Sequence, residues 1–443
     1  MTRTRWFERR WVLPMLLALW VIVPEVRRLI DWQIGFAALS VVNLIPLAAL
    51  VLFIALPLRK QPRPLPPALV VTLAAWTIGF GLAMLVGLLT GQRLNAFYEF
   101  GQFMLPVLIL YVIIAARDDI PVFRDLSWSL CALGAFVAVY GIAQYISPLP
   151  WDVLWVNNSG LSSIGVPEPF GLRIFSTLNS YELCADFLAL AIITQLPYLR
   201  AGRGLLLRLP ASLLMLAALA LTFDRSAWIA LVLGAFAYVV LSPRRTAALA
   251  GVGAIAVLGG ALFVAGPSLF GQSPAFTTIA DRLSSLGDVD SDTSYQARQY
   301  ETAVTLEETR EEPIGQGIGT VGTSTKLSEA QSTTTVDGGY LSRLLEMGVF
   351  GFAAYLIALG AALLLSLQAW NAARLDGRTG DALVGAACLA LQLALLALDI
   401  AADHHNSLPG LLFWIAVAIP ARQLLQHPLR VRKPHARTRF APS

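Results

Sequence analysis

Charged residues and cysteines are both scarce in this sequence. Only 14% of its 443 residues are charged and 56% are hydrophobic, whereas charged residues make up about a quarter of a typical soluble protein. The three cysteines, Cys131, Cys184 and Cys388, lie within apolar runs and form neither a disulfide framework nor a metal-ligand spacing. The sequence also lacks tandem repeats of the solenoid kind and a separate soluble domain. These absences argue against a water-soluble enzyme, a disulfide scaffold and a repeat protein.

Long apolar runs are what the sequence has in abundance. Runs of about 17–25 residues, the length of a membrane-spanning helix, recur along the whole chain. They predict an all-α polytopic membrane protein, a single integral domain over residues 1–443 with about twelve transmembrane helices. The expected spans are 11–29, 34–57, 66–90, 96–116, 125–146, 179–199, 206–222, 226–242, 247–267, 338–368, 381–401 and 406–425. The first run shows no small-residue cleavage site, so we expect it to be retained as a helix.

Basic residues are divided unevenly between the two sides of this arrangement. Loops and ends on one side carry 22 of the 32 Lys and Arg residues, and the alternation from loop to loop never breaks. Basic residues accumulate in cytoplasmic loops of membrane proteins. The pattern therefore predicts that both termini are cytoplasmic.

Two long connections are expected on the outer side, at 147–178 and 268–337. Loops this long are uncommon unless they are functional or disordered. The second contains a helical pattern, SYQARQYETAVTLEETREEP, followed by PIGQGIGT. No Gly-Lys-Ser/Thr follows these glycines, so the segment is not a nucleotide P-loop. We interpret it as a tight turn that leads out of an external helix, within a functional loop.

Arginines on the outer side run against the topological trend. They are Arg27, Arg28, Arg93, Arg173, Arg225, Arg282, Arg298, Arg310 and Arg343, with Lys326 the only outer lysine. Singly, each can snorkel, pair with a neighbour such as Asp224 beside Arg225, or touch lipid headgroups. Together, Arg173, Arg225 and Arg298 predict a diphosphate site, because guanidinium is always charged and its planar donors match phosphate oxygens.

Two carboxylates flank the start of a late span, in TTTVDGGYLSRLLEMGVFG. Asp337 can cap the helix and favour its dipole, or it can act as a general base outside the membrane. Glu346 lies about two and a half helical turns deeper, where a carboxylate needs a cavity or a partner. We expect a structural hydrogen-bonding role for Glu346.

The segment DIAADHHNSLPG places His404 and His405 at the outer end of another span. Metal binding is one interpretation, but the histidines are adjacent and no further ligands are apparent. A pH-sensitive or hydrogen-bonding end is the interpretation we favour, with no metal.

Three motifs resemble the O-antigen ligase and Wzy-type polymerase superfamily of bacterial polysaccharide assembly. GLRIFSTLNSYELCADFLAL is similar to the family's segment of Arg, Gly-Thr-like turn, Asn and helix, with Arg173 and Asn179 fitting and Ser176 replacing the usual Gly. LTFDRSAWIAL is similar to the entry to a later span, with Asp224 where Ser is common. The stretches ARQYETAVTLEETREEPIGQGIGT and VDGGYLSRLLEMGVFG look like the large external loop and the next helix.

One departure concerns the candidate base. Where typical ligases have His followed by Asn, this sequence has Asp337 and Gly338, while Tyr340, Leu341 and Glu346 keep the register. An acid at this position is more familiar among polymerases and exopolysaccharide enzymes of the group. The departure therefore weighs against a ligase and favours Asp337 as the base.

The resemblance implies a GT-C-like glycosyltransferase on the periplasmic face of the bacterial inner membrane. It would polymerise repeat units carried on undecaprenyl pyrophosphate, with inversion and without metal or other cofactor. The implied catalytic residues are Asp337, Arg225 and Arg298, and Arg173, Arg225 and Arg298 would bind the diphosphate. Supporting or sugar-binding positions are Tyr340, Glu346, Asn179, Trp228, His404 and His405.

The implied partners are membrane lipid, a lipid-linked oligosaccharide and a polysaccharide co-polymerase that regulates chain length, with no nucleic acid. Three alternatives remain open. A ligase would share the donor but transfer finished polymer to lipid A-core or protein. A twelve-span transporter would commonly show similar halves, and none are clear here. A non-catalytic assembly partner is the third.

Overall fold

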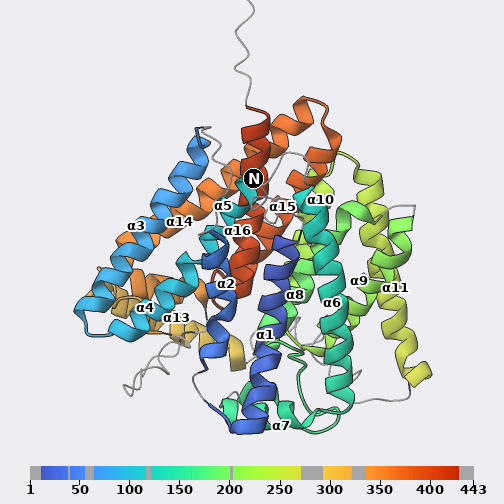
Figure 1. The fold of residues 1–443 in the computed structure, drawn as a ribbon, viewed down its shortest axis with the longest axis horizontal. Helices are drawn as coiled ribbons and strands as arrows, with labels where there is room; N and C mark the ends of the chain where they lie inside the picture. The colour runs from blue at the N-terminus through green and yellow to red at the C-terminus, as the bar shows by residue number, and fades with distance from the viewer. Residues whose placement is uncertain are drawn as a thin grey trace, which may run out of the picture.

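The computed structural model describes residues 11–37, 40–54, 64–115, 121–160, 162–199, 203–270, 293–321, 336 and 338–428. This part of the chain is all-α (Figure 1), and its only β-type pairing is the isolated bridge between Gly165 and Leu172. The α-helices are α1 Val12–Ile34, α2 Ile45–Ile54, α3 Pro67–Leu89, α4 Arg93–Met104, α5 Ile109–Ile114, α6 Val122–Ile146, α7 Pro150–Ser159, α8 Tyr181–Gln195, α9 Arg203–Leu221, α10 Arg225–Leu241, α11 Arg245–Phe270, α13 Thr293–Glu311, α14 Gly339–Leu375, α15 Thr379–Leu398 and α16 Ser407–Gln426. Short 3-10 helices are η1 Val41–Leu44, η2 Pro106–Leu108, η3 Ser162–Ile164 and η4 Leu196–Tyr198.

The helices confirm a multi-pass membrane protein. Within the described residues, seven helical segments are long and apolar enough to cross a bilayer, and shorter apolar helices lie at 41–53, 225–241 and 245–261. The run expected at 96–116 is interrupted, because α4 ends at Met104 and η2 begins at Pro106. Proline has no N–H for the helical ladder and clashes with the preceding turn, which accounts for the tighter 3-10 segment.

Two groups of helices flank a buried centre. In Figure 1, α3 and α14 lie side by side with α4 and α13 near one end, and α6, α8, α9, α10 and α11 form the other flank. The first pair can approach closely because a Cβ atom on Gly79 of α3 would lie 2.9 Å from the Gly351 carbonyl oxygen of α14. A larger residue at Gly79 would separate the two helices.

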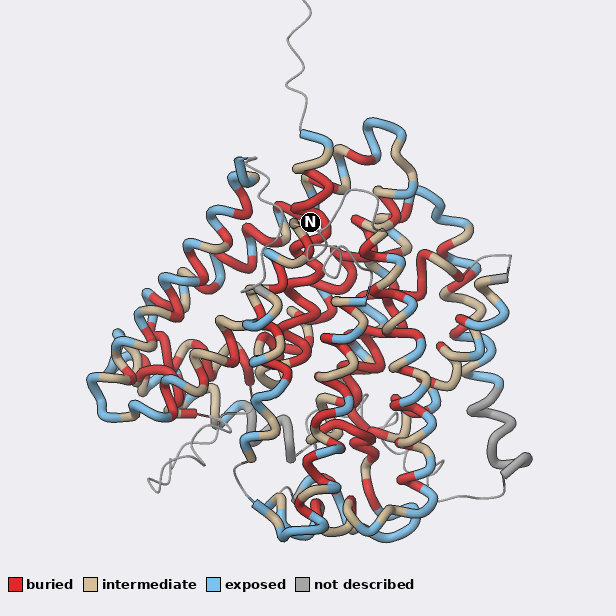
Figure 2. Tube along the Cα trace, in the orientation of Figure 1, coloured by how far each residue is buried: buried red, intermediate tan, exposed pale blue. Residues whose placement is uncertain are grey.

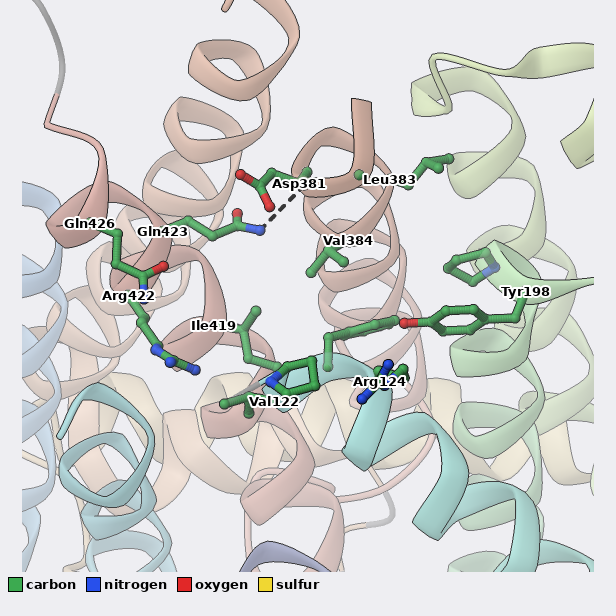
Figure 3. Close-up of a pocket in the computed structure, with 14 residues that line it drawn as sticks. Val122, Arg124, Tyr198, Asp381, Leu383, Val384, Ile419, Arg422, Gln423 and Gln426 are labelled. Carbon is green, nitrogen blue, oxygen red and sulfur yellow. Dashed lines mark hydrogen bonds between the residues drawn. The ribbon is translucent and has the colours of Figure 1, made fainter. Parts of the chain in front are cut away.

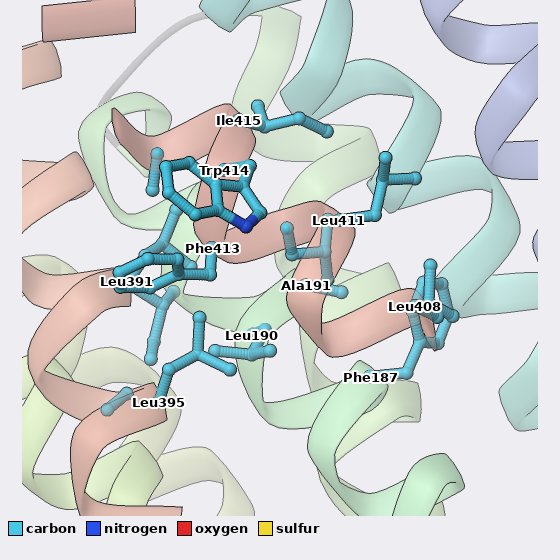
Figure 4. Packing of buried hydrophobic residues seen from close by; sticks show 14 of the residues in the cluster. Phe187, Leu190, Ala191, Leu391, Leu395, Leu408, Leu411, Phe413, Trp414 and Ile415 are labelled. Atoms are coloured by element: carbon cyan, nitrogen blue, oxygen red, sulfur yellow. The ribbon is translucent and has the colours of Figure 1, made fainter. Parts of the chain in front are cut away.

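Helix α16 forms the centre of the molecule. It is buried along most of its length, as the red trace in Figure 2 shows, and α15 and α8 pack beside it. Phe187 of α8, Leu391 of α15 and Leu411 and Trp414 of α16 are all at most 3% exposed and meet in this contact (Figure 4). The core thus fixes the segments that enter α8 and α16, which carry several of the candidate site residues.

Candidate functional site

The segment before α8 carries Arg173 in a constrained backbone. Its amide donates to the Ile164 carbonyl at 2.8 Å, and the next amide, of Ile174, donates to the Leu221 carbonyl at the end of α9. The half-buried Arg173 guanidinium lies 4.6 Å from the centre of the Tyr181 ring. Because the Ile174–Leu221 bond joins this segment to the turn before Arg225, it brings two of the predicted diphosphate-binding segments together.

Ser176 holds the turn that follows Arg173. Its φ is 53°, in the left-handed region that non-glycine residues seldom occupy. The Gln144 side-chain oxygen accepts from the amides of Phe175 and Ser176 at 3.1 and 2.9 Å, and the Ser176 hydroxyl donates to the Val137 carbonyl at 2.7 Å. These bonds offset the unfavourable backbone and attach the turn to α6.

Asn179 precedes the N-cap of α8. Ser180 is that N-cap, and its hydroxyl accepts from the Leu183 amide at 3.2 Å. Asn179 is half-buried, and its side-chain oxygen finds no hydrogen-bond partner among the described residues. An amide in this position can bind a polar ligand that approaches the start of α8.

Arg225 is the first residue of α10. Asp224 is the N-cap, and its carboxylate accepts from the Ser226 amide at 2.9 Å and from the Ser226 hydroxyl. The Trp228 indole donates to the Leu219 carbonyl at 3.1 Å, which ties α10 to α9. Arg225 is half-buried. The cap and the indole bond therefore orient the turn on which Arg225 sits.

Two acidic residues of α8, Glu182 and Asp186, lie near Asp224 of this turn. Glu182 lies within electrostatic range of Asp224, Asp186 and His404. Asp186 is fully buried, and its carboxylate lies 2.6 Å from His404 Nδ1. Burial lowers the pKa of His404, but the Asp186 carboxylate outweighs burial and raises it to about 9. His404 is accordingly an imidazolium at neutral pH.

The loop between α15 and α16 is held by a second pair. Asp399 contacts His405 Nδ1, accepts from the His404 amide at 2.9 Å, and accepts from the Tyr355 hydroxyl at 2.7 Å. Burial works against the charge of Asp399, yet the imidazole of His405 keeps the pKa of that carboxyl below its usual value. Tyr340 contacts the same region, because its hydroxyl donates to the Leu396 carbonyl near the end of α15 at 2.9 Å and its amide donates to the Asp399 carbonyl at 3.3 Å.

Glu346 is fully buried in α14, and each of its two carboxylate oxygens has a polar neighbour. Its Oε1 accepts from the Gly319 amide at 2.8 Å, and its Oε2 lies 2.6 Å from the Arg343 guanidinium. Arg343 also donates to Asp403 at 2.9 Å and lies 4.4 Å from the Phe103 ring centre. These contacts link α14 to the 399–406 loop, and the structural role expected for Glu346 stays a prediction.

The glycine-rich turn 313–320 docks against three helices. Its glycines at 315, 317 and 319 all have φ near 90°, a conformation that favours glycine. A Cβ atom on Gly317 would lie 2.3 Å from the Gly87 nitrogen of α3, and one on Gly315 would lie 2.4 Å from the Gly348 nitrogen of α14. Gly348 breaks the helical path of α14 with φ 63° and ψ −174°. The turn thus fits where α14 bends and attaches the end of α13 to the spans.

A buried ion cluster joins α1 to α7, and it includes one of the arginines expected on the outer side. Arg28 is fully buried, pairs with Glu25 and with Asp152 at 3.0 Å, and donates to the Ser176 carbonyl at 2.5 Å. The Tyr140 hydroxyl donates to Glu25 at 2.5 Å. Burial raises the pKa of Asp152 to about 6. Through its bond to the Ser176 carbonyl, Arg28 therefore helps to hold the turn that follows Arg173.

Two of the predicted catalytic residues lie wholly or partly outside the described residues. Asp337 lies outside the described residues, although its neighbour Gly338 is placed so that a Cβ atom on it would lie 3.4 Å from the Ile400 carbonyl oxygen. The backbone of Arg298 belongs to α13, and its side chain lies outside the described residues. The start of α14 accordingly meets the same α15–α16 loop that carries His404.

Residues 210–356 match the Wzy_C family, described as O-antigen ligase. This match covers 147 of the 443 residues of the chain. Among curated proteins, no significant match was found. Members of the Wzy_C family are glycosyltransferases of the O-antigen ligase and polymerase type, which transfer lipid-linked glycans. The resemblance seen in the sequence is confirmed, and the transporter interpretation is disfavoured.

The Wzy_C match extends from within α9 to the first half of α14. It includes Arg225, Arg298, Asp337 and Glu346, whereas Arg173 and His404 lie outside it. The Ile174–Leu221 bond joins the Arg173 segment to the matched region. Ser176 stands where the resemblance has glycine, and its positive φ gives a reason for glycine at that position.

Sequence reasoning missed Glu182 and Asp186 as parts of the site. An acidic residue inside an apolar run was the signal available, because such residues face a partner or a cavity. Asp186 is one, and its partner His404 was identified only as the end of a distant span. The pairing itself depends on how α8 and α16 pack.

Proposed function

We propose that this Wzy_C protein polymerises repeat units carried on undecaprenyl pyrophosphate, as a GT-C-like inverting glycosyltransferase in the bacterial inner membrane. The observation that carries the proposal is the hydrogen bond of Ile174 to Leu221, which joins the segments of Arg173 and Arg225 at one end of the helical domain. Two guanidinium groups on adjoining turns suit the two phosphates of one diphosphate.

The proposed orientation follows from the charge distribution. Twelve crossings with cytoplasmic termini put the starts of α8, α10, α14 and α16 on the periplasmic side. The site would then face the compartment in which lipid-linked repeat units meet. The lipid tail would enter between helices, and the loop 268–337 would cover the sugars.

The chemical step is a displacement at the anomeric carbon. A hydroxyl oxygen of the acceptor forms a bond to the anomeric carbon while the bond between that carbon and the diphosphate oxygen breaks. The configuration at the carbon inverts. The bonding electrons leave with undecaprenyl diphosphate, and the hydroxyl proton passes to Asp337. Arg173, Arg225 and Arg298 would stabilise the charge that develops on the diphosphate. Because the leaving group is a stabilised anion, the step needs no nucleotide.

The buried acids and histidines would act as support. Paired His404 and Asp186 fix the α15–α16 loop against α8, and Arg343 joins Glu346 to Asp403. Asn179 lies just before α8 and Tyr340 lies in the first turn of α14. Both would contact the sugar or the acceptor. The support for these roles is proximity to the Arg173 and Asp337 segments.

The runner-up is a ligase that transfers finished polymer to lipid A-core or protein. Asp337 with Gly338, in place of the His and Asn of typical ligases, favours the polymerase. Purified protein in liposomes with lipid-linked repeat units as the only glycan should yield a ladder of lengths on a gel. Folded protein that makes no ladder, but makes one large conjugate once lipid A-core is added, would establish the ligase instead.

Variants test the residues. Arg173→Ala and Arg225→Ala should each lower the polymerisation rate by about 100-fold or more, and Asp337→Asn should abolish the ladder. Arg245→Gln removes an exposed arginine at the start of α11 and serves as the matched control. Unchanged rates in all three test variants would overturn the proposed site.

A further inference from the structure

A cavity of about 400 Å³ opens at the end of the helical domain opposite the candidate site. It lies where α6 and α15 begin and α16 ends, beside η4, whereas the candidate site lies where α15 ends and α16 begins. Its polar lining comes from Arg124, Tyr198, Asp381, Arg422, Gln423 and Gln426 (Figure 3). Its volume falls within the range of ligand pockets, about 300–1,000 Å³.

The cavity wall has an excess of positive charge. Its lining carries two guanidinium groups, Arg124 and Arg422, and one carboxylate, Asp381. Arg124 lies 3.9 Å from the carboxylate of Asp125 outside the lining, and Asp381 pairs with Arg378 at 2.6 Å. In Figure 3 the two guanidinium groups flank Val122. The Arg422 residue is only 6% exposed, so its field is poorly screened by water. An anion is the ligand that this wall favours.

A third arginine, Arg208, lies outside the lining and contacts one of the lining residues. Arg208 is 2% exposed and lies 4.2 Å from the ring centre of Tyr198, a residue that lines the cavity. Its guanidinium donates to the Gln195 side chain at 2.6 Å and to Ser127 at 2.5 Å. These contacts hold Tyr198 in place and add positive charge to the same end of the cavity.

The rest of the lining is apolar. Val122, Leu383, Val384 and Ile419 line the cavity together with Pro121, Phe123 and Pro197. A free inorganic ion would leave this surface without a partner, whereas an amphiphile would cover it. Basic pockets between helices on the cytoplasmic side of membrane proteins bind the headgroups of anionic lipids.

We propose that this cavity binds the phosphate group of an anionic membrane phospholipid. The phosphate lies between Arg124 and Arg422, and the glycerol and upper acyl chains cover the apolar wall. The bound lipid bridges α6, α15 and α16 at the end where the basic loops gather. It is distinct from the glycan donor, because the cavity lies at the other end of α15 and α16 from the Arg173 turn.

Lipid exchange on the full-length protein tests the proposal. Detergent-purified protein is titrated with phosphatidylglycerol, with phosphatidylcholine and with inorganic phosphate, and bound lipid is counted by native mass spectrometry alongside the apparent unfolding temperature. We expect one retained phosphatidylglycerol and a rise in unfolding temperature that phosphatidylcholine does not reproduce. Stabilisation by inorganic phosphate alone, as large as that by phosphatidylglycerol, would overturn the lipid as the source of the phosphate group.

Matched variants locate the bound lipid. Arg124→Gln, at a side chain 49% exposed, should fold normally and weaken phosphatidylglycerol binding by about tenfold, the loss of one charged contact. Arg422→Gln should weaken it further, and Arg124→Gln decides the matter where Arg422→Gln does not fold. Arg245→Gln, an exposed arginine away from the cavity, should bind as the unmodified protein does. Equal affinity in Arg124→Gln and Arg245→Gln would overturn the site.

Discussion

The ion pair of His404 and Asp186 predicts a stability that declines at alkaline pH. Burial opposes protonation, but Asp186 raises the pKa of His404 from 6.5 to about 9. Since the folded-state pKa lies above the unfolded value, the stabilising contribution is complete below about pH 6.5 and is lost as the pH rises through about 9. At about 1.4 kcal/mol for each pKa unit, the protonation of His404 in the folded state contributes about 3 kcal/mol to the free energy of unfolding.

The variant His404→Gln should remove this contribution while keeping a polar side chain in place. We expect the apparent unfolding temperature in detergent to fall well below that of the unmodified protein at about pH 6 and to converge with it near pH 10. Altered packing would add a constant offset, so the change of the gap with pH is the quantity that decides. His427→Gln, at an exposed position after α16, is the control and should show no gap. A gap of equal size at both pH values would refute the reasoning.

Two further substitutions test other buried contacts by the same unfolding assay. Arg28→Gln leaves the buried carboxylates of Glu25 and Asp152 without their positive partner, so we expect the free energy of unfolding to fall by about 3–5 kcal/mol near neutral pH. Because burial raises the pKa of Asp152 to about 6, acidification below that value should recover part of the loss. A loss that does not change with pH would contradict this account. Gly317→Ala forces a Cβ atom to 2.3 Å from a backbone nitrogen of α3 at φ 94°, so it should cost about 1–3 kcal/mol and expose the end of α13 to protease. Gly81→Ala, with open space around its Cβ position, should leave both the stability and the cleavage pattern of the protein nearly unchanged.

The helices could be predicted from the sequence because membrane spans are long and almost uniformly apolar. The interruption at Pro106 is equally local, since it follows from a missing N–H. The glycine-rich segment 313–320 could be identified as a tight turn. Its docking beside Gly87 and Gly348 could not, because the close contacts involve helices far away in the chain.

The candidate site was predictable only in part, for a similar reason. Arg173 and Arg225 stand out because charge on the outer side of a membrane protein needs an explanation. The Ile174–Leu221 bond that joins their segments depends on tertiary packing. Arg28 illustrates the opposite case, since the sequence groups it with the outer arginines and the structure buries it in an ion cluster. The roles of Asp337 and Arg298 stay predictions.

The docked glycine-rich turn gives α13 a fixed pivot. The C-terminal end of α13 at Glu311 is anchored through the turn at 313–320, and its Thr305 and Thr309 side chains are buried. The Arg298 backbone lies about 20 Å along the helix axis from that end, at about 1.5 Å for each residue. A swing of about 10° would carry it by about 3.5 Å over this lever arm. Small rotations at the pivot would thus be amplified at the position of Arg298.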